Sequence, residues 1–319
     1  MQPAKIIAAL AALSFLTLAG AQAQQQQGAA AAVAAARGNA PILAWASKPT
    51  KLPAYTGPNR LVYRFADVMK AYAGKSDWKQ QVHLSRDFTA SWISMGAGKK
   101  TKAAFHADDK TFWVVQSGQM RVTIEGQAPF IAGKHFLVQV PNRLIYSMET
   151  VGNEPVVYLM VEPAGEPPQY PLSETPTPVP GFNYIRATYS GHGEYEGINR
   201  PFIDFEKEVV QEGKRTNVWI RDDHTYVTIL RSQKGVPTPP PTSWGHMHAN
   251  FAEFWLIIEG RQEFLIEGEK LISVEDGDLV ATTNGRWHRG SAAGDGPSTR
   301  LAFIPRPDNL HWLQPPSGN

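Results

Sequence analysis

Short runs of apolar and strand-forming residues, separated by Gly, Pro and Asp, fill most of the chain from about residue 81 onward. In the first half these runs cover residues 82–84, 90–94, 111–116, 120–124, 136–140 and 156–161. Strands of this length and spacing are typical of an all-β barrel or sandwich. Helical periodicity is restricted to residues 65–72 and 205–211, which predict two short helices, one ahead of each β-rich region.

The second half of the chain repeats the first at a fixed spacing. The offset between Phe112 and Phe254 is 254 − 112 = 142, and six other identities share it. They are Trp113 and Trp255, Gly118 and Gly260, Ile124 and Ile266, Glu125 and Glu267, Gly126 and Gly268, and Asn142 and Asn284. The two halves are therefore predicted to be copies of one β domain.

A proline-rich stretch separates the two halves. Residues 167–181 contain repeated Pro residues, which favour a stiff, extended connection and cannot lie inside a sheet. We therefore expect an N-terminal barrel at residues 51–166, a linker at residues 167–181 and a C-terminal barrel at residues 182–319.

The first residues have the pattern of a secretory signal peptide. Lys5 precedes the apolar run at residues 6–18, and small residues follow, ending at Ala23. The run of about 13 residues is shorter than the roughly 20 that a membrane span needs. We expect a signal peptide at residues 1–23, a Gln- and Ala-rich tether at residues 24–50, no membrane attachment after cleavage, and a periplasmic or secreted protein.

Composition excludes several classes of protein. The 319 residues are 42% hydrophobic, which is enough for packed cores and excludes a disordered chain. The 31 Lys and Arg nearly balance the 29 Asp and Glu, so nucleic acid is not an expected partner. The chain contains no Cys, which excludes thiol, disulfide and iron–sulfur chemistry based on Cys.

Three His residues and one Glu in the second half form a candidate metal site. His246 and His248 are two positions apart, so on a strand both rings would point to the same face. Glu253 follows a short turn, and His288 would come from a third strand that a closed sheet can bring near. Three imidazoles and a carboxylate suit a borderline divalent metal ion.

These residues resemble the two sequence motifs of the cupin superfamily. In the first motif, Pro240 replaces the usual opening Gly, and His246, His248, Glu253 and Gly260 stand at the expected intervals. In the second, Gly277, Gly285 and His288 match, with Thr283 in place of the usual Pro. Both departures concern turns and leave the ligand positions intact.

The resemblance implies two tandem cupin barrels of jelly-roll type and one divalent transition metal, with Cu, Zn, Mn, Fe and Ni left open. The metal ligands would be His246, His248, Glu253 and His288. At the offset that relates the two halves, the first half has Ala104, His106, Thr111 and Tyr146 in the same four positions. Because His106 alone could not retain a divalent ion, the N-terminal barrel is expected to be structural, with a degenerate metal site.

The leading functional hypothesis is a metal-dependent oxidoreductase of the dioxygenase type, acting on a small oxygen-rich or carboxylated substrate. Glu253 is the candidate proton carrier, and Arg286 is the candidate substrate clamp, because it precedes His288 by two positions and an Arg can bind a carboxylate in bidentate fashion. Two alternatives stay open: a metal-assisted isomerase or lyase on a sugar acid, and a non-catalytic small-molecule binding protein. Assembly into homo-oligomers is also left open.

Overall fold

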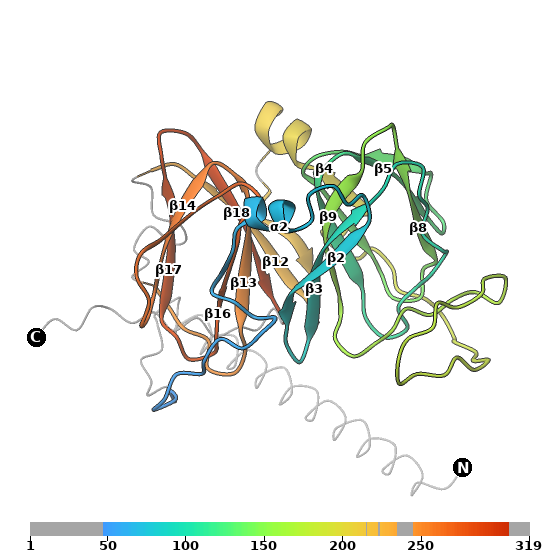
Figure 1. Ribbon diagram of the computed structural model, residues 1–319, viewed down its shortest axis with the longest axis horizontal. Helices are drawn as coiled ribbons and strands as arrows, with labels where there is room; N and C mark the ends of the chain where they lie inside the picture. Colours follow the sequence, from blue (N-terminus) through green and yellow to red (C-terminus); the bar gives the residue numbers. More distant parts are fainter. Residues whose placement is uncertain (1–46, 215, 223, 235–244, 306–319) are drawn as a thin grey trace, which may run out of the picture. The chain divides into compact units, whose positions relative to one another are not determined.

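The computed structural model describes residues 47–214, 216–222, 224–234 and 245–305, which form two β-sandwich barrels (Figure 1). Within these ranges the strands make two six-stranded and two three-stranded sheets, and every strand pairing is antiparallel. The predicted signal peptide and most of the predicted tether lie outside the described residues. Within the described part, no helix is long and apolar enough to span a membrane.

The first barrel packs a six-stranded sheet against a three-stranded sheet. The large sheet has the order β10-β7-β4-β9-β3-β2, with β10 at Phe202–Asp204, β7 at Phe136–Val140, β4 at Thr111–Ser117, β9 at Val156–Pro163, β3 at Phe88–Met95 and β2 at Trp78–Leu84. The small sheet has the order β6-β5-β8, with β6 at Phe130–Ala132, β5 at Gln119–Ile124 and β8 at Tyr146–Val151. All six runs predicted in the first half are strands.

The second barrel has the same construction. Its large sheet has the order β1-β16-β13-β18-β12-β11, with β1 at Val62–Tyr63, β16 at Leu279–Thr282, β13 at Glu253–Glu259, β18 at Ser298–Ile304, β12 at Tyr226–Ser232 and β11 at Val218–Arg221. Its small sheet has the order β15-β14-β17, with β15 at Ile272–Glu275, β14 at Arg261–Ile266 and β17 at His288–Ala293. The predicted all-β fold with two barrels is confirmed.

The spacing of the sequence repeat is also the spacing of the strands. The first residues of β4 and β13 are related by the same offset (253 − 111 = 142), and so are those of β5 and β14, β8 and β17, and β9 and β18. The insertions and deletions between the two copies therefore fall outside these strands.

Each barrel contributes a short strand to the other barrel's large sheet. Strand β1 precedes the first barrel in sequence but pairs with β16 of the second, and β10 follows the Pro-rich segment but pairs with β7 of the first. The boundaries predicted at residues 51 and 182 therefore do not coincide with the sheets. Edge strands have unpaired backbone groups, and a short neighbouring segment can satisfy them wherever it lies in the sequence.

Both predicted helices are present. Helix α2 covers Phe65–Ala71, and η1 covers Phe205–Gln211 as a π-helix, an uncommon form that the periodicity did not indicate. The side chain of Arg64, at the N-cap of α2, makes no capping bond. Instead Asp278 of the second barrel accepts hydrogen bonds from the Phe65 amide at 3.0 Å and from Arg64 Nη1 at 2.7 Å.

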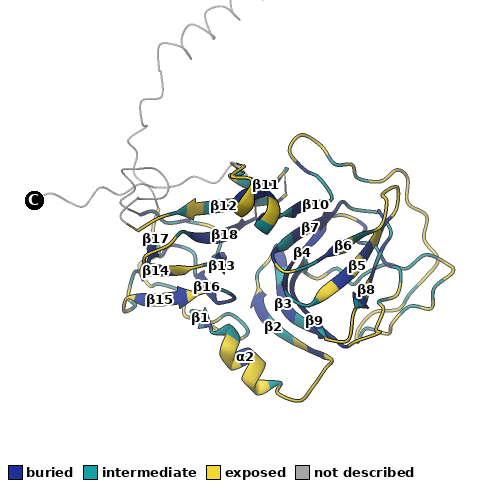
Figure 2. Cartoon of the chain, turned by 90° about the horizontal axis from the view of Figure 1, so that it is seen from above, coloured by how far each residue is buried: buried dark blue, intermediate teal, exposed yellow. Residues whose placement is uncertain are grey.

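Alternation along the central strands divides the core into three parts. Phe112 and Phe254 belong to one cluster made by the two large sheets, whereas Trp113 and Trp255 face the interiors of their own barrels. Figure 2 shows this pattern as buried residues along the strands of both large sheets. Because each large sheet is buried on both faces, its strands carry nearly continuous apolar runs.

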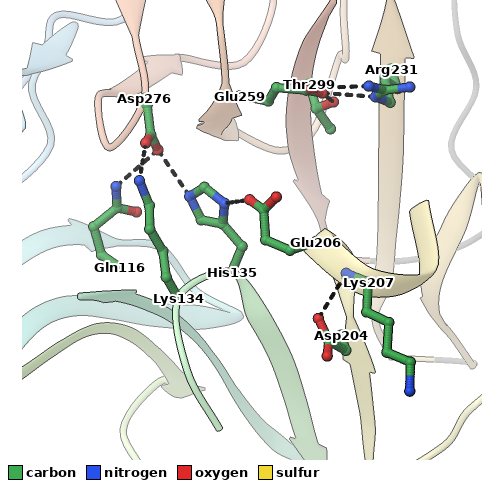
Figure 3. A network of polar contacts seen from close by, with 10 residues as sticks. All are labelled: Gln116, Lys134, His135, Asp204, Glu206, Lys207, Arg231, Glu259, Asp276 and Thr299. Atoms are coloured by element: carbon green, nitrogen blue, oxygen red, sulfur yellow. Dashed lines mark hydrogen bonds and ion pairs between the residues drawn. The ribbon is translucent and has the colours of Figure 1, made fainter. Parts of the chain in front are cut away.

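Polar contacts also join the two barrels (Figure 3). Asp276, between β15 and β16, accepts hydrogen bonds from Gln116 at 2.8 Å and from Lys134 at 2.7 Å. The His135 ring lies between two carboxylates, with Nε2 3.1 Å from Asp276 and Nδ1 2.5 Å from Glu206 of η1. The first barrel is thereby tied to the second barrel and to the helix that follows the linker.

The Pro-rich segment contacts the first barrel. Between β9 and β10 it forms an isolated bridge, from Gln169 to Phe105. Further along the same connection, the Tyr195 hydroxyl donates to the Gln139 carbonyl at 2.8 Å. Residues 167–181, all of which the structure describes, contain no strand beyond this bridge.

Candidate metal centre

His246, His248, Glu253 and His288 converge in the interior of the second barrel. One ligand atom from each residue lies within 4.8 Å of the ligand atoms of the other three. Glu253 Oε2 is 2.7 Å from His248 Nε2, 3.2 Å from His288 Nε2 and 3.9 Å from His246 Nε2. The structure thus assembles the four residues that the sequence motifs single out.

The backbone that carries these residues differs in part from the prediction. Glu253 and His288 begin β13 and β17, as expected, but His246 and His248 do not lie on a regular strand. His246 forms one isolated bridge with His288, and the Gly285 amide donates to the His248 carbonyl at 2.6 Å. The backbones of His246 and His248 are therefore held by hydrogen bonds to His288 and Gly285, and not by the pairing of a regular strand.

Burial and mutual contacts determine the electrostatics of the cluster. His248, Glu253 and His288 are buried, while 19% of the His246 side chain is exposed, so this ligand lies nearest to solvent. Burial alone would raise the pKa of the Glu253 carboxyl, but hydrogen bonds and charge interactions with His248 and His288 hold it well below its ordinary value. Glu253 is therefore an anion surrounded by imidazoles.

The orientation of His288 fits a metal ligand. Its Nδ1 lies 2.9 Å from the Arg286 carbonyl oxygen, which can only accept, so a neutral ring carries its proton on Nδ1. The lone pair of Nε2 is then available to a metal ion, which would replace the proton that Nε2 otherwise shares with Glu253 Oε2 at 3.2 Å. Metal-binding imidazoles commonly have such an arrangement, with the second nitrogen held by a carbonyl. The four residues are consistent with one divalent transition metal.

Aromatic side chains line the cluster. Phe251 stacks on the His248 ring with centroids 4.2 Å apart, and the Trp255 ring lies 5.1 Å from the His288 ring. Trp255 is buried and lies two positions after Glu253 on β13, so both side chains point to the inward side of the strand. These rings fix the imidazoles and limit the access of water to the buried side of the site.

Arg286 is held by several neighbours. Its Nε donates to the Thr283 hydroxyl at 2.9 Å, Nη1 to the Glu267 carbonyl at 2.7 Å, and Nη2 to the Pro53 carbonyl at 3.1 Å. The guanidinium also lies 5.0 Å from the Tyr55 ring centroid. These contacts favour a positioning role, because Arg286 also supplies the carbonyl that orients His288. A direct contact between Arg286 and substrate stays a prediction.

Arg300 is a candidate residue that the sequence patterns did not single out. It lies on β18, is buried, and donates from Nη1 to Gln262 at 2.9 Å. Burial lowers the pKa of its guanidinium to about 10, with an opposing interaction from Glu253, so it stays charged at neutral pH. The sequence feature that could have pointed to it is the position of an Arg among the apolar residues of a strand, because a charge inside a barrel is costly unless it has a partner.

Comparison with known proteins agrees with this architecture. The family model for the cupin domain matches residues 236–304, which include all four residues of the cluster. No curated protein sequence matches the chain.

Several solved structures of oxalate decarboxylases are similar in fold. A single-residue variant of the Bacillus subtilis enzyme is 14% identical, with a TM-score of 0.50, over 80% of this chain and 79% of that one. The formate complex of the Lactobacillus farciminis enzyme is 13% identical, also with a TM-score of 0.50, over 80% of this chain and 88% of that one. At this level of identity the likeness shows the fold alone, and it agrees with the two jelly-roll barrels described above.

Proposed function

We propose that this two-barrel cupin protein is a metal-dependent enzyme of the dioxygenase type, acting on a small oxygen-rich or carboxylated molecule in its C-terminal barrel. The observation that carries the proposal is the convergence of three imidazoles and one carboxylate in a buried interior. A divalent transition metal bound there would act as a Lewis acid and leave coordination positions for substrate and dioxygen.

Glu253 is the residue best placed to combine binding with proton transfer. It contacts His248 and His288 at 2.7 and 3.2 Å and is buried with them, so its carboxylate has a defined position. A carboxylate in this position can serve as a metal ligand and can also carry a proton to or from a bound molecule.

The buried charge of Arg300 supports an anionic or oxygen-rich substrate. Its guanidinium lies in the same barrel interior as the cluster and interacts electrostatically with Glu253. A positive charge in a water-poor interior attracts carboxylates more strongly than an exposed one does. The aromatic rings of Phe251 and Trp255 shield the reacting groups from bulk water on the buried side.

We also propose that the enzyme works outside the cytoplasm. Support comes from the signal-peptide pattern at residues 1–23. Cell fractionation, followed by N-terminal sequencing of the purified protein, tests this directly. A mature N-terminus near Gln24 in the periplasmic or secreted fraction is the expected result, and an intact Met1 in the cytoplasmic fraction would contradict it.

Oxygen consumption with phenolic and carboxylic substrates tests the enzymatic proposal. Wild-type protein purified with its metal should consume oxygen. In His288→Ala a ligand is removed, so the rate should fall by more than the roughly 10- to 100-fold that loss of an outer-shell partner of a metal site costs. Exposed His192→Ala should retain the full rate. Turnover without oxygen would contradict the dioxygenase assignment in favour of an isomerase or lyase. Saturable binding without any product would contradict an enzymatic role.

A further inference from the structure

The interior of the first barrel keeps polar residues where a purely structural barrel would have apolar ones. At the offset that relates the two halves, His106, Thr111 and Tyr146 correspond to His248, Glu253 and His288. Tyr158 corresponds to Arg300 in the same way (300 − 158 = 142). All four of these first-barrel residues are buried. His106 keeps the imidazole of His248, and the other three positions carry uncharged hydroxyl groups in place of a carboxylate, an imidazole and a guanidinium.

Several buried polar atoms of the first barrel have no hydrogen-bond partner within the described part of the chain. They are both ring nitrogens of His106, the Ser91 hydroxyl and the Trp113 indole nitrogen. His106 is 2% exposed, and Ser91 and Trp113 are fully buried. Burying such groups without partners is costly, so folded proteins normally satisfy them with protein, water or ligand.

The strand registers place these groups in one region of the barrel. Ser91 on β3 and Trp113 on β4 both pair with Met160 of β9, from opposite sides, and share its inward face. Tyr158 lies two positions before Met160 on that face, and the Trp113 ring is 5.7 Å from the Tyr146 ring. Four strands, β3, β4, β8 and β9, and the segment that carries His106 therefore bring these groups together in the interior of the first barrel.

Glu162, whose side chain is 19% exposed, brings a carboxylate close to these groups. Its Oε1 lies 3.9 Å from His106 Nε2, too far for a hydrogen bond, and its Oε2 lies 3.3 Å from the exposed Lys79. The carboxylate also interacts electrostatically with Tyr146 and Tyr158. An anionic ligand would be repelled by this carboxylate, in contrast to the barrel that contains Arg300.

The state of the titratable groups agrees with an uncharged ligand. Burial lowers the pKa of His106 and raises the pKa of both Tyr146 and Tyr158. At neutral pH the site therefore offers a neutral imidazole and two protonated phenols. Together with the Ser91 hydroxyl and the Trp113 indole, they supply several donors that complement hydroxyl oxygens.

We infer that the N-terminal barrel is a second, metal-independent binding site for a small uncharged molecule with adjacent ring hydroxyls, held by Ser91, His106, Trp113, Tyr146 and Tyr158. Aromatic diols and cyclic polyols share this chemistry. Their rings can pack on the indole and phenol faces while their hydroxyls pair with the orphaned polar atoms. The site does not depend on the metal centre of the second barrel.

Isothermal titration of the full chain with catechol and with myo-inositol tests this inference. We expect saturable binding of at least one probe, retained in His246→Ala, in which the metal centre is disrupted. Binding of catechol alone would identify an aromatic diol site, and binding of myo-inositol alone would identify a polyol site. Absence of binding by both probes would overturn the inference.

Variants locate the binding in the first barrel. Ser91→Ala and Tyr158→Phe each remove only a hydroxyl, so the packing is kept and affinity should fall about three- to tenfold, as expected for one lost hydrogen bond. Tyr63→Phe also removes a hydroxyl, one that donates to the Pro58 carbonyl, and it should leave affinity unchanged. Binding that is lost in His246→Ala, or unaffected by both the Ser91 and Tyr158 changes, would overturn the assignment to this barrel.

Discussion

The backbones of His246 and His288 are hydrogen-bonded to each other in both directions. The His246 amide donates to the His288 carbonyl at 3.0 Å, and the His288 amide donates to the His246 carbonyl at 2.8 Å. Ala104 and Tyr146 make the same reciprocal pair in the first barrel, at 3.0 and 2.9 Å. The backbone that positions two candidate metal ligands in one barrel is thus preserved in the other, where the side chains have changed.

Removal of His288 should abolish metal binding without unfolding the protein. Wild-type chain should hold about one divalent ion, whereas His288→Ala should hold almost none, because loss of a ligand weakens binding by more than the roughly 10- to 100-fold that loss of an outer-shell partner costs. Elemental analysis of purified protein measures this directly. His192→Ala, which removes an exposed imidazole, is the control and should keep the metal. Equal metal content in the two variants would disprove the assignment of the ligands.

Gly245, which precedes His246, should tolerate no side chain. Its φ is +96°, and an added Cβ would lie 2.3 Å from the Trp287 ring and 2.7 Å from the His288 carbonyl. We expect Gly245→Ala to lower the free energy of unfolding by about 2–4 kcal/mol, from backbone strain and overpacking, and to reduce metal content. Denaturant titration provides the measurement.

Gly126→Ala is a matched control for this change. Gly126 also has a positive φ, of +75°, but its added Cβ would meet nothing within 4 Å. It should therefore show the conformational cost alone, about 1 kcal/mol, with metal content unchanged. If the two Ala variants were equally stable, the close contact at Gly245 would have no energetic role.

The Asp276 carboxylate should make stability depend on pH at the acidic end. Burial would raise its pKa, but hydrogen bonds from His135, Lys134 and Gln116 lower it to about 2. Because the folded pKa lies below the unfolded value of about 3.9, this contribution is fully present above pH 4 to 5 and is lost as pH falls toward 2. Asp276→Asn should cost about 1–2 kcal/mol at neutral pH and almost nothing near pH 2.

Urea unfolding at a series of pH values measures the Asp276 effect. Asp295→Asn, which removes an exposed carboxylate, is the control and should shift the urea unfolding curves little at any pH. A difference between Asp276→Asn and wild type that stays constant from pH 7 to pH 2 would contradict a contribution from the ionised carboxylate.

Asp278 should stabilise the segment that joins the two barrels at α2. It is buried, accepts from Arg64 and the Phe65 amide, and also accepts from the Glu275 amide at 3.2 Å. Asp278→Ala leaves these donors without their acceptor and should cost about 2–3 kcal/mol in the free energy of unfolding. Asp67→Ala, at an exposed position in the first turn of the same helix, should cost less than about 1 kcal/mol. An equal loss of unfolding free energy in the two variants would show that the hydrogen bonds of Asp278 contribute no more than an exposed carboxylate does.

The order of residues along the chain is enough to predict the fold class, the duplication and the identity of the clustered residues. Strand length and the Gly, Pro and Asp between strands are local properties, and the fixed offset makes a repeat visible without any structure. The spacing of His246, His248 and Glu253 pointed to the candidate metal cluster, because residues near one another in sequence leave a local signature. His288, far along the chain, was linked to them by the expectation of a closed sheet and by its place in the second motif.

Features that depend on contacts between distant residues became visible in the folded protein alone. The exchange of β1 and β10, the capping of α2 by Asp278 and the bridge between His246 and His288 all join segments far apart in sequence, and no local pattern specifies such pairs. The inward orientation of Arg300 and the unpartnered polar atoms of the first barrel likewise follow from burial. Burial is a property of the packed barrel and cannot be assigned from one residue and its neighbours.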